Sequence, residues 1–323
     1  MIKNLLDNYF TEFTDIICKI SEVYHYEGKV DKAMELFDST KTLFNTPEFK
    51  DEDKARILIQ FANIRINNKF LKDFNYDQEI NMLKEAQILA ENSNAEKIQA
   101  DAIDLMGNCI YQTGILKGEY EKALLYYNKA LPIRVKIKDK LGLSKSYFHL
   151  GLYHQNKKDA DENDNKLALD YYEKGLKIAV EEDFKLEQSY FFRHIAGIYA
   201  YIKEDLNKGL EYFKRSTQLR EEIGFIFNLQ FAYFAEAFIY FLKKDIDNAR
   251  DYFMKAYVAA KNVSRIEALK ALLFRRGDEI VREIDLKAAL DYFSILLDVA
   301  RKINDDKGLI EIELKIKKLS EKE

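Results

Sequence analysis

The stretch Glu119-Tyr120-Glu121-Lys122-Ala123-Leu124-Leu125-Tyr126-Tyr127-Asn128-Lys129-Ala130-Leu131 sets the pattern for the whole chain. If this stretch is helical, Ala123, Tyr127 and Ala130 lie on one face, because residues three and four positions apart are neighbours on a helix. Small residues on both sides of an aromatic ring let a second helix approach closely, while the ring fills the space between them. The stretch therefore predicts a helix that packs tightly against another helix.

The same pattern of a small residue, an aromatic residue and a small residue recurs along the chain. The copies are Ala33/Phe37/Thr40, Ala123/Tyr127/Ala130, Ala168/Tyr172/Gly175, Gly209/Phe213/Ser216 and Ala249/Phe253/Ala256, with weaker copies at Ala289/Phe293/Leu296 and Glu79/Leu83/Ala86. Taken in chain order, their first residues are 46, 44, 45, 41, 40 and 40 positions apart. A near-constant period of this size indicates a solenoid of stacked repeats.

A second helical segment precedes each copy of the pattern. Several of these segments carry a glycine in mid-helix, among them Gly107, Gly151 and Gly197. A glycine inside a helix costs about 1 kcal/mol relative to alanine. We therefore expect these glycines where a neighbouring helix approaches closely, so that each repeat is a pair of helices.

The composition excludes several other classes of protein. Among 323 residues there are only 12 Gly and 2 Pro, too few for the many turns of a sandwich or barrel. The net charge of −4 provides no basic field to attract nucleic acid. The N-terminus lacks the apolar run of a signal peptide, and the most apolar stretch, Phe225–Leu242, is interrupted by polar residues. We expect a cytoplasmic protein without membrane contact, and Cys18 and Cys109 as free thiols.

The repeated helix pair resembles the tetratricopeptide repeat (TPR). The clearest copy runs from Ile20 to Phe37, and its Tyr24, Gly28 and Ala33 have the family's spacing. The resemblance covers residues 5–302, although the period exceeds the family's 34 residues, and the family's early Trp and inter-repeat Pro are absent. Repeats of about 40 residues resemble those of kinesin light chains, Pins-type adaptors and bacterial Rap-type peptide receptors.

The resemblance implies an all-α fold, a right-handed α-solenoid in one domain spanning residues 1–323. About seven helix-turn-helix repeats are expected, followed by a capping helix. The expected repeats are residues 5–45, 47–92, 95–136, 139–181, 184–222, 225–262 and 265–302, and the capping helix is residues 305–322.

No set of residues typical of catalysis or metal binding is present in the sequence. The four histidines (His25, His149, His154 and His194) do not form a metal-binding motif, and we expect them to be exposed or groove residues. The Gly114–Gly118 segment lacks the Lys-Ser/Thr that follows a phosphate-binding loop. We therefore expect no catalytic residue, no cofactor and no metal, and interpret the chain as not an enzyme.

A groove on the concave face is the expected binding site, because the resemblance implies that the first helix of each repeat lines it. The residues expected to contact a partner are Asn63, Asn67, Asn108, Tyr111, Gln112, Lys145, Phe148, Gln155, His194 and Tyr201. Asn and Gln carry both donors and acceptors, so they can bind the backbone of an extended peptide. Alternatively, the amides reflect composition alone, and the nearby Phe234, Phe238 and Phe241 belong to the core.

The expected function is a non-catalytic scaffold or adaptor that binds a peptide or protein segment. Two alternatives remain open: a peptide-responsive sensor resembling Rap-type receptors, and a regulatory subunit of a separately encoded enzyme. Two other stretches are candidate contact sites. One is the acidic segment Asn156–Lys166, expected to be a long loop, and the other is a basic cluster between Lys261 and Arg282.

Overall fold

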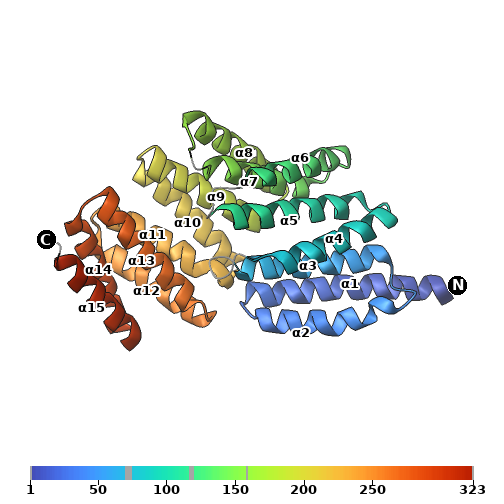
Figure 1. Cartoon of the computed structure of the whole chain (residues 1–323), viewed down its shortest axis with the longest axis horizontal. Helices are drawn as coiled ribbons and strands as arrows, with labels where there is room; N and C mark the ends of the chain where they lie inside the picture. The colour runs from blue at the N-terminus through green and yellow to red at the C-terminus, as the bar shows by residue number, and fades with distance from the viewer. Residues whose placement is uncertain (1, 70–74, 116–119, 158, 322–323) are drawn as a thin grey trace. The chain divides into compact units, whose positions relative to one another are not determined.

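The protein is built from α-helices. The computed structural model describes residues 2–69, 75–115, 120–157 and 159–321 (Figure 1). Within these ranges the chain forms fifteen α-helices and no β-strand, which confirms the all-α solenoid predicted from the repeats. Glu119 of the opening stretch, Gly118, Lys158 and Lys322 lie outside the described residues.

Fourteen of the helices follow one another as seven pairs. The pairs are α1 (Ile2–Tyr26) and α2 (Val30–Lys41); α3 (Asp51–Lys69) and α4 (Asp77–Asn92); α5 (Glu96–Ile115) and α6 (Glu121–Lys136); α7 (Lys140–Gln155) and α8 (Glu162–Glu181); α9 (Lys185–Gly197) and α10 (Leu206–Glu222); α11 (Leu229–Leu242) and α12 (Ile246–Asn262); α13 (Ile266–Glu283) and α14 (Leu286–Lys302). Helix α15 (Asp306–Ser320) follows the last pair. Short 3₁₀ segments cover Thr42–Asn45 and Ile226–Asn228, and a π-helical segment, Ile198–Ile202, extends α9.

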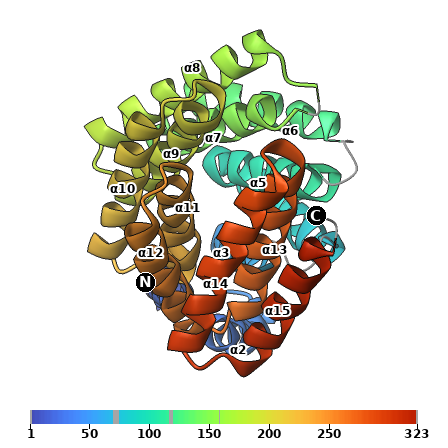
Figure 2. The same cartoon turned by 90° about the vertical axis from the view of Figure 1, so that its left-hand side faces the viewer.

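The helices group into two compact units. Unit 1 is Met1–Phe191 and unit 2 is Phe192–Glu323, so the boundary lies inside α9. Within unit 1, helices α1 to α8 each contact the next helix along the chain. In unit 2, α10, α11 and α12 lie side by side, and α14 packs on both α13 and α15 (Figure 2). The expectation of a single domain stays a prediction.

Each copy of the repeated pattern lies in the second helix of a pair. All 21 of its positions are buried, including those of the two weaker copies. Glu79 occupies a position that is small elsewhere, and its carboxylate accepts hydrogen bonds from Arg65 Nε (2.6 Å) and Lys69 Nζ (2.8 Å). Burial alone raises the pKa of Glu79, but these two cations outweigh it and lower the pKa below its ordinary value.

Within three pairs, the aromatic ring of the pattern lies directly against a glycine of the first helix. A Cβ atom added to Gly107 would lie 2.7 Å from Tyr127, one added to Gly151 would lie 2.4 Å from Tyr172, and one added to Gly277 would lie 2.2 Å from Phe293. Gly107 and Gly151 were expected at such contacts, and Gly277 adds a third example. The absence of a side chain is what allows the helices of these pairs to approach.

Helix α11 is buried along almost its whole length. Phe234, Phe238 and Phe241 are 4–7 % exposed and belong to the core of unit 2, where Phe238 and Phe241 pack edge-on against Tyr292. These three rings are therefore core residues and do not line a groove. Their burial explains why this segment is the most apolar of the chain.

The second half of the expected long acidic loop is helix. Asp161 is the N-cap of α8 and accepts a hydrogen bond from the Asp164 backbone N–H (2.8 Å), so residues 162–166 are helical. Asp164 is buried and accepts from Lys157 Nζ (2.7 Å). The prediction of a loop over the whole of 156–166 was wrong because its acidic residues form a capping box.

Gly151 offers a direct test of the contact between ring and glycine. Gly151→Ala should lower the free energy of unfolding by about 1–3 kcal/mol, because the new methyl group overlaps the Tyr172 ring. Chemical denaturation followed by circular dichroism measures this change. Adding Tyr172→Leu should remove most of the penalty for Ala at position 151, since the smaller side chain leaves room for it. Equal penalties in both backgrounds would contradict the explanation.

Candidate functional site

Two pairs of carboxamides lie on the first helices of neighbouring repeats in unit 1. Asn63 and Asn67 are one turn apart on α3, and Asn108 and Gln112 are one turn apart on α5. All four side chains are half-buried, and the second pair lies 45 positions after the first, which matches the repeat period. Helices α3 and α5 are in contact, so the two pairs occupy equivalent places on adjacent helices (Figure 1).

Each amide pair is joined by a hydrogen bond between its own members. Asn67 Nδ2 donates to Oδ1 (3.2 Å) and to the backbone oxygen (3.0 Å) of Asn63. Gln112 Nε2 donates to Asn108 Oδ1 (3.3 Å), and Tyr76 Oη donates to Gln112 Oε1 (2.7 Å). The structure therefore brings together these four predicted residues in a held arrangement, and adds Tyr76, which the sequence patterns did not single out.

The other predicted residues of unit 1 have different surroundings. Tyr111 is only 5 % exposed and packs edge-on against Tyr120, so it is a core residue. Phe148 lies in an aromatic cluster with Tyr190 and Phe191. Of the remaining two, Lys145 Nζ lies 3.8 Å from a Glu187 oxygen, and Gln155 Oε1 accepts a hydrogen bond from Tyr172 Oη (2.7 Å). Tyr111 and Phe148 therefore serve packing, because aromatic rings fill the space between successive helices.

His194 and Tyr201 belong to unit 2. His194 is half-buried, and burial together with Arg193 and Arg220 holds the pKa of its imidazole well below the ordinary value. Tyr201 lies in the π-helical segment, and its ring faces Phe238 and the Arg276 guanidinium, with the guanidinium carbon 5.6 Å from the ring centre. A neutral imidazole and a phenol can both take part in hydrogen bonds with a partner. Whether they contact one remains a prediction.

A cluster of buried charges lies between α5, α6 and α7. Arg134, which is 1 % exposed, donates to Asp101 (2.7 Å) and to Ser146 (2.7 Å). Asp104 lies 3.3 Å from Arg134 Nη1 and 2.7 Å from His149 Nδ1, and the His149 ring stacks on Tyr127. The expectation that His149 is exposed or lines a groove was therefore wrong, because the Asp104 carboxylate draws its ring into the interior.

This charge cluster has the electrostatics of a structural network. Burial alone raises the pKa of Asp104, but Arg134 and His149 outweigh it and hold the pKa at about 2. The Ser146 hydroxyl in the cluster accepts a hydrogen bond from Arg134, and the Asp101 and Asp104 carboxylates pair with Arg134 and His149. We therefore assign it to the packing of successive repeats.

A second buried carboxyl group, Glu236, lies in unit 2. Burial raises its pKa to about 7, although Thr217 Oγ1 donates to it at 2.5 Å and Lys214 lies nearby. The side chain is 1 % exposed. A perturbed pKa is typical of functional sites, but a carboxyl group closed off from solvent cannot meet a substrate.

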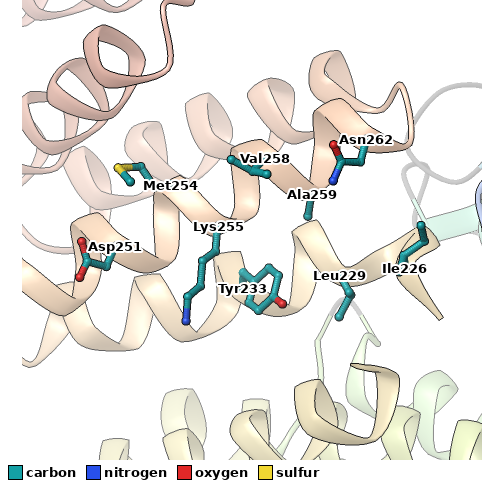
Figure 3. Close-up of a pocket in the computed structure, with 9 residues that line it drawn as sticks. All are labelled: Ile226, Leu229, Tyr233, Asp251, Met254, Lys255, Val258, Ala259 and Asn262. Carbon is teal, nitrogen blue, oxygen red and sulfur yellow. The ribbon is translucent and has the colours of Figure 1, made fainter. Parts of the chain in front are cut away.

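An open groove of about 450 Å³ lies between α11 and α12 in unit 2 (Figure 3). Ile226, Leu229 and Tyr233 line one side, and α12 provides the other. On α12, Val258 is 52 % exposed, and the Lys255 ammonium lies 4.3 Å from the centre of the Tyr252 ring. The sequence patterns did not predict this groove. Val258 was the sign of it in the sequence, because it is an apolar residue on the solvent side of α12, whose opposite face carries the repeat pattern.

The basic residues between Lys261 and Arg282 do not form one surface patch. Lys270 is 4 % exposed and its Nζ lies 2.9 Å from Asp305 Oδ2, while Arg265 is 1 % exposed and stacks over Phe227. Arg276 pairs with Glu279 at 2.7 Å. Most of these charges are therefore engaged within the fold, and the cluster is not assigned as a site for an acidic ligand.

In the described part of the chain, no group of three or more His, Cys, Asp or Glu side chains is arranged to hold a metal ion. No helix described there has the length and apolar character needed to cross a membrane. Cys18 and Cys109 are free thiols, as predicted, and burial raises the pKa of Cys18 to about 11.

Stacked helix pairs with small and aromatic residues at their contacts define the class of protein, an α-solenoid. Residues 232–261, which span parts of α11 and α12, match the tetratricopeptide repeat family. The match covers one helix pair of this α-solenoid, α11 and α12. The sequence matches no curated protein.

Three solved structures are similar to this chain. A signal-transduction ATPase with numerous domains from Pyrococcus horikoshii, which has a tetratricopeptide repeat sensor, is 17 % identical with a TM-score of 0.56. That match covers 94 % of this chain and 47 % of the other, so this chain spans about half the length of the archaeal protein. Aspartyl phosphate phosphatase F from Bacillus subtilis is 14 % identical with a TM-score of 0.49, and the match covers 95 % of this chain and 94 % of the phosphatase chain. A Rap protein complexed with competence and sporulation factor is 12 % identical with a TM-score of 0.48, and the match covers 96 % of this chain and 98 % of the Rap protein.

Asp104→Asn tests the buried charge cluster. The substitution keeps the shape of the side chain but removes the charge that faces Arg134, and should lower the free energy of unfolding by about 3–5 kcal/mol. Denaturant titration at neutral pH measures the loss. Asp170→Asn is the matched control, because Asp170 pairs with Lys174 on the surface and should change stability by less than about 0.5 kcal/mol.

The same cluster predicts a dependence of stability on pH. The folded pKa of Asp104, about 2, lies below its ordinary value near 3.9, so its contribution is complete above about pH 4 and is lost as the pH falls towards 2. Acid denaturation curves should therefore be less steep for Asp104→Asn than for the unmodified protein in this range. Parallel curves would show that Asp104 is not the group responsible.

Proposed function

We propose that this protein is a non-catalytic scaffold that binds an extended peptide segment across the half-buried amide pairs of α3 and α5. The observation that carries the proposal is the recurrence of the pair Asn63/Asn67 as Asn108/Gln112, each pair closed by its own hydrogen bond. Because the bonded amide pair recurs one repeat later, the solenoid offers two similar sets of hydrogen-bond donors and acceptors along its length.

The internal bonds leave specific atoms for a ligand. In the first pair, Asn67 Oδ1 and the Asn63 N–H groups are not used by the bonds between the two side chains. In the second pair, the Asn108 N–H groups remain, since its oxygen accepts from Gln112. A peptide backbone carries one donor and one acceptor per residue, so it complements both pairs without selecting a particular side chain.

The spacing of the helices suits an extended chain. Packed helix axes lie about 8–10 Å apart, and an extended peptide rises about 3.3 Å per residue. The two pairs would therefore be bridged by about three residues of peptide. Tyr76 fixes the Gln112 side chain before a ligand arrives, which reduces the entropy lost on binding.

The match of residues 232–261 to the tetratricopeptide repeat family supports this proposal. The related fold from P. horikoshii includes a tetratricopeptide repeat sensor, so recognition of another molecule is a role that this architecture supports in another protein. For the present chain, the amide pairs are the surface that we propose for recognition.

Asn108→Ala combined with Gln112→Ala should weaken the binding of a peptide. The probe is the best binder selected from a phage-displayed random peptide library against the full chain, and isothermal titration calorimetry measures its Kd. We expect a loss of at least about tenfold, because one of the two amide pairs is removed. Binding that survives this double substitution unchanged would contradict the proposal.

Two matched controls separate recognition from stability. Tyr76→Phe removes the hydrogen bond that fixes Gln112 but leaves every carboxamide in place, so peptide binding should weaken much less than in the double alanine variant, with a loss of stability of about 1 kcal/mol. Val258→Lys alters the α11–α12 groove and should leave binding unchanged. A loss of binding in Val258→Lys, with the amide variant unaffected, would place the ligand in the groove.

A further inference from the structure

Helix α1 carries a row of exposed apolar side chains, which we call the α1 stripe. It consists of Leu6, Tyr9, Phe13, Ile16, Ile20 and Val23. Five of these are 39–55 % exposed, and Phe13 is half-buried. Apolar residues of this size on successive turns of one helix are far more than the scattered exposed residues of an ordinary surface.

The α1 stripe is separate from the face by which α1 joins its own unit. That inner face carries Thr14, Ile17 and Ser21, which are at most 5 % exposed. Its hydrogen bonds run to α3, where Gln60 Nε2 donates to Ser21 Oγ (3.2 Å). The inner face of α1 therefore packs into the core of the first repeat, and the α1 stripe points away from it.

The next repeat shows what normally covers this surface. Ile16, Ile20 and Val23 are followed 41 positions later by Ile57, Phe61 and Ile64 on α3. Those three residues are completely buried, and Phe61 packs on Phe37 of α2 with ring centres 4.9 Å apart. In α3 the preceding helix pair covers this face, whereas for α1 no helix pair precedes it in the described chain.

The spacing within the α1 stripe specifies the kind of partner. Its six residues follow one another at intervals of 3, 4, 3, 4 and 3, which is the heptad pattern of a two-helix coiled coil. The row is about 26 Å long at 1.5 Å per residue. It fits a second α-helix lying along α1.

The charges beside the stripe match those of a second copy of this chain. Glu12 and Lys19 are exposed, one heptad apart, and occupy the flank of the stripe that faces solvent. In an antiparallel pair of α1 helices, Phe13 lies opposite Ile16 of the second copy and Tyr9 opposite its Ile20. This register places Glu12 of each copy beside Lys19 of the other.

We propose that the α1 stripe is a homodimer interface, in which two copies of this chain pair their α1 helices antiparallel about a two-fold axis. Two Glu12–Lys19 pairs form by symmetry, and the other flank of α1 is already occupied by its own unit. An isolated helix pair of this length is marginal in water, but α1 is held as a helix by α2 and α3. Association therefore does not have to supply the free energy of helix formation.

Sedimentation equilibrium of the full chain tests the dimer. We expect a species of twice the 38.0 kDa chain mass over a concentration series, and a monomer for Ile16→Lys with Ile20→Lys. Folding should be unaffected because both side chains are exposed, and circular dichroism checks this. Ile88→Lys with Val180→Lys is the matched control, since both are equally exposed elsewhere in unit 1 and should leave the dimer intact. A monomeric unmodified chain, or assembly that grows beyond the dimer, would overturn the proposal.

Charge reversal tests the register. Glu12→Lys and Lys19→Glu should each weaken the dimer by about tenfold, because each turns two attractive pairs into two repulsive ones. The double variant should restore the original Kd. Equal weakening in the single and double variants would overturn the pairing of Glu12 with Lys19.

Cysteine cross-linking tests the orientation in a Cys18→Ser background. In the antiparallel register, a Phe13→Cys chain should form a disulfide only when mixed with an Ile16→Cys chain. A parallel pair would instead cross-link each single variant with itself, and that result would overturn the antiparallel arrangement. Ile88→Cys, which is exposed on α4, is the control and should not cross-link in either experiment.

Discussion

The contact between an aromatic ring and the backbone of a glycine is the constraint on which the repeated helix pair depends. At Gly107, Gly151 and Gly277 the ring of the second helix takes the place where a side chain of the first helix would stand. The ring contributes the buried apolar area and the glycine contributes the close approach, so neither residue is useful without the other. Glycine weakens an isolated helix, so the first helix of each of these pairs depends on packing against the second helix for its stability.

Two buried carboxylates of this fold are held in the interior by opposite charges. Glu79 replaces a small residue of the repeated pattern and is bound by Arg65 and Lys69, while Asp104 is bound by Arg134 and His149. Both carboxylates have a lowered pKa, which means that the fold favours their charged forms in spite of burial. Such networks add specificity to an array of similar repeats, since a shift of one repeat against the next would separate the partners.

The repeated pattern predicted the fold well because it depends on neighbours in sequence. Ala123, Tyr127 and Ala130 are completely buried on α6, which packs against α5, the helix just before it in the chain. The candidate site was harder to predict. Tyr111 and Asn108 are close on one helix, yet Tyr111 packs on Tyr120 and is buried while the amide stays accessible. His149 and Asp104, 45 positions apart, could not be paired from the sequence, because the charge cluster depends on the relative rotation of α5 and α7.

The α1 stripe shows why position in an array matters as much as residue type. The same apolar face occurs on α1 and on α3. It is exposed on α1, at Ile16, Ile20 and Val23, and buried on α3, at Ile57, Phe61 and Ile64. A repeat fold stacks each unit on the one before, which covers this face in α3, whereas in α1 the face is exposed within the described residues. This chain keeps the face apolar and places Glu12 and Lys19 beside it. An array that only needed to be soluble would gain from polar residues at these positions, so their retention favours a partner that buries them.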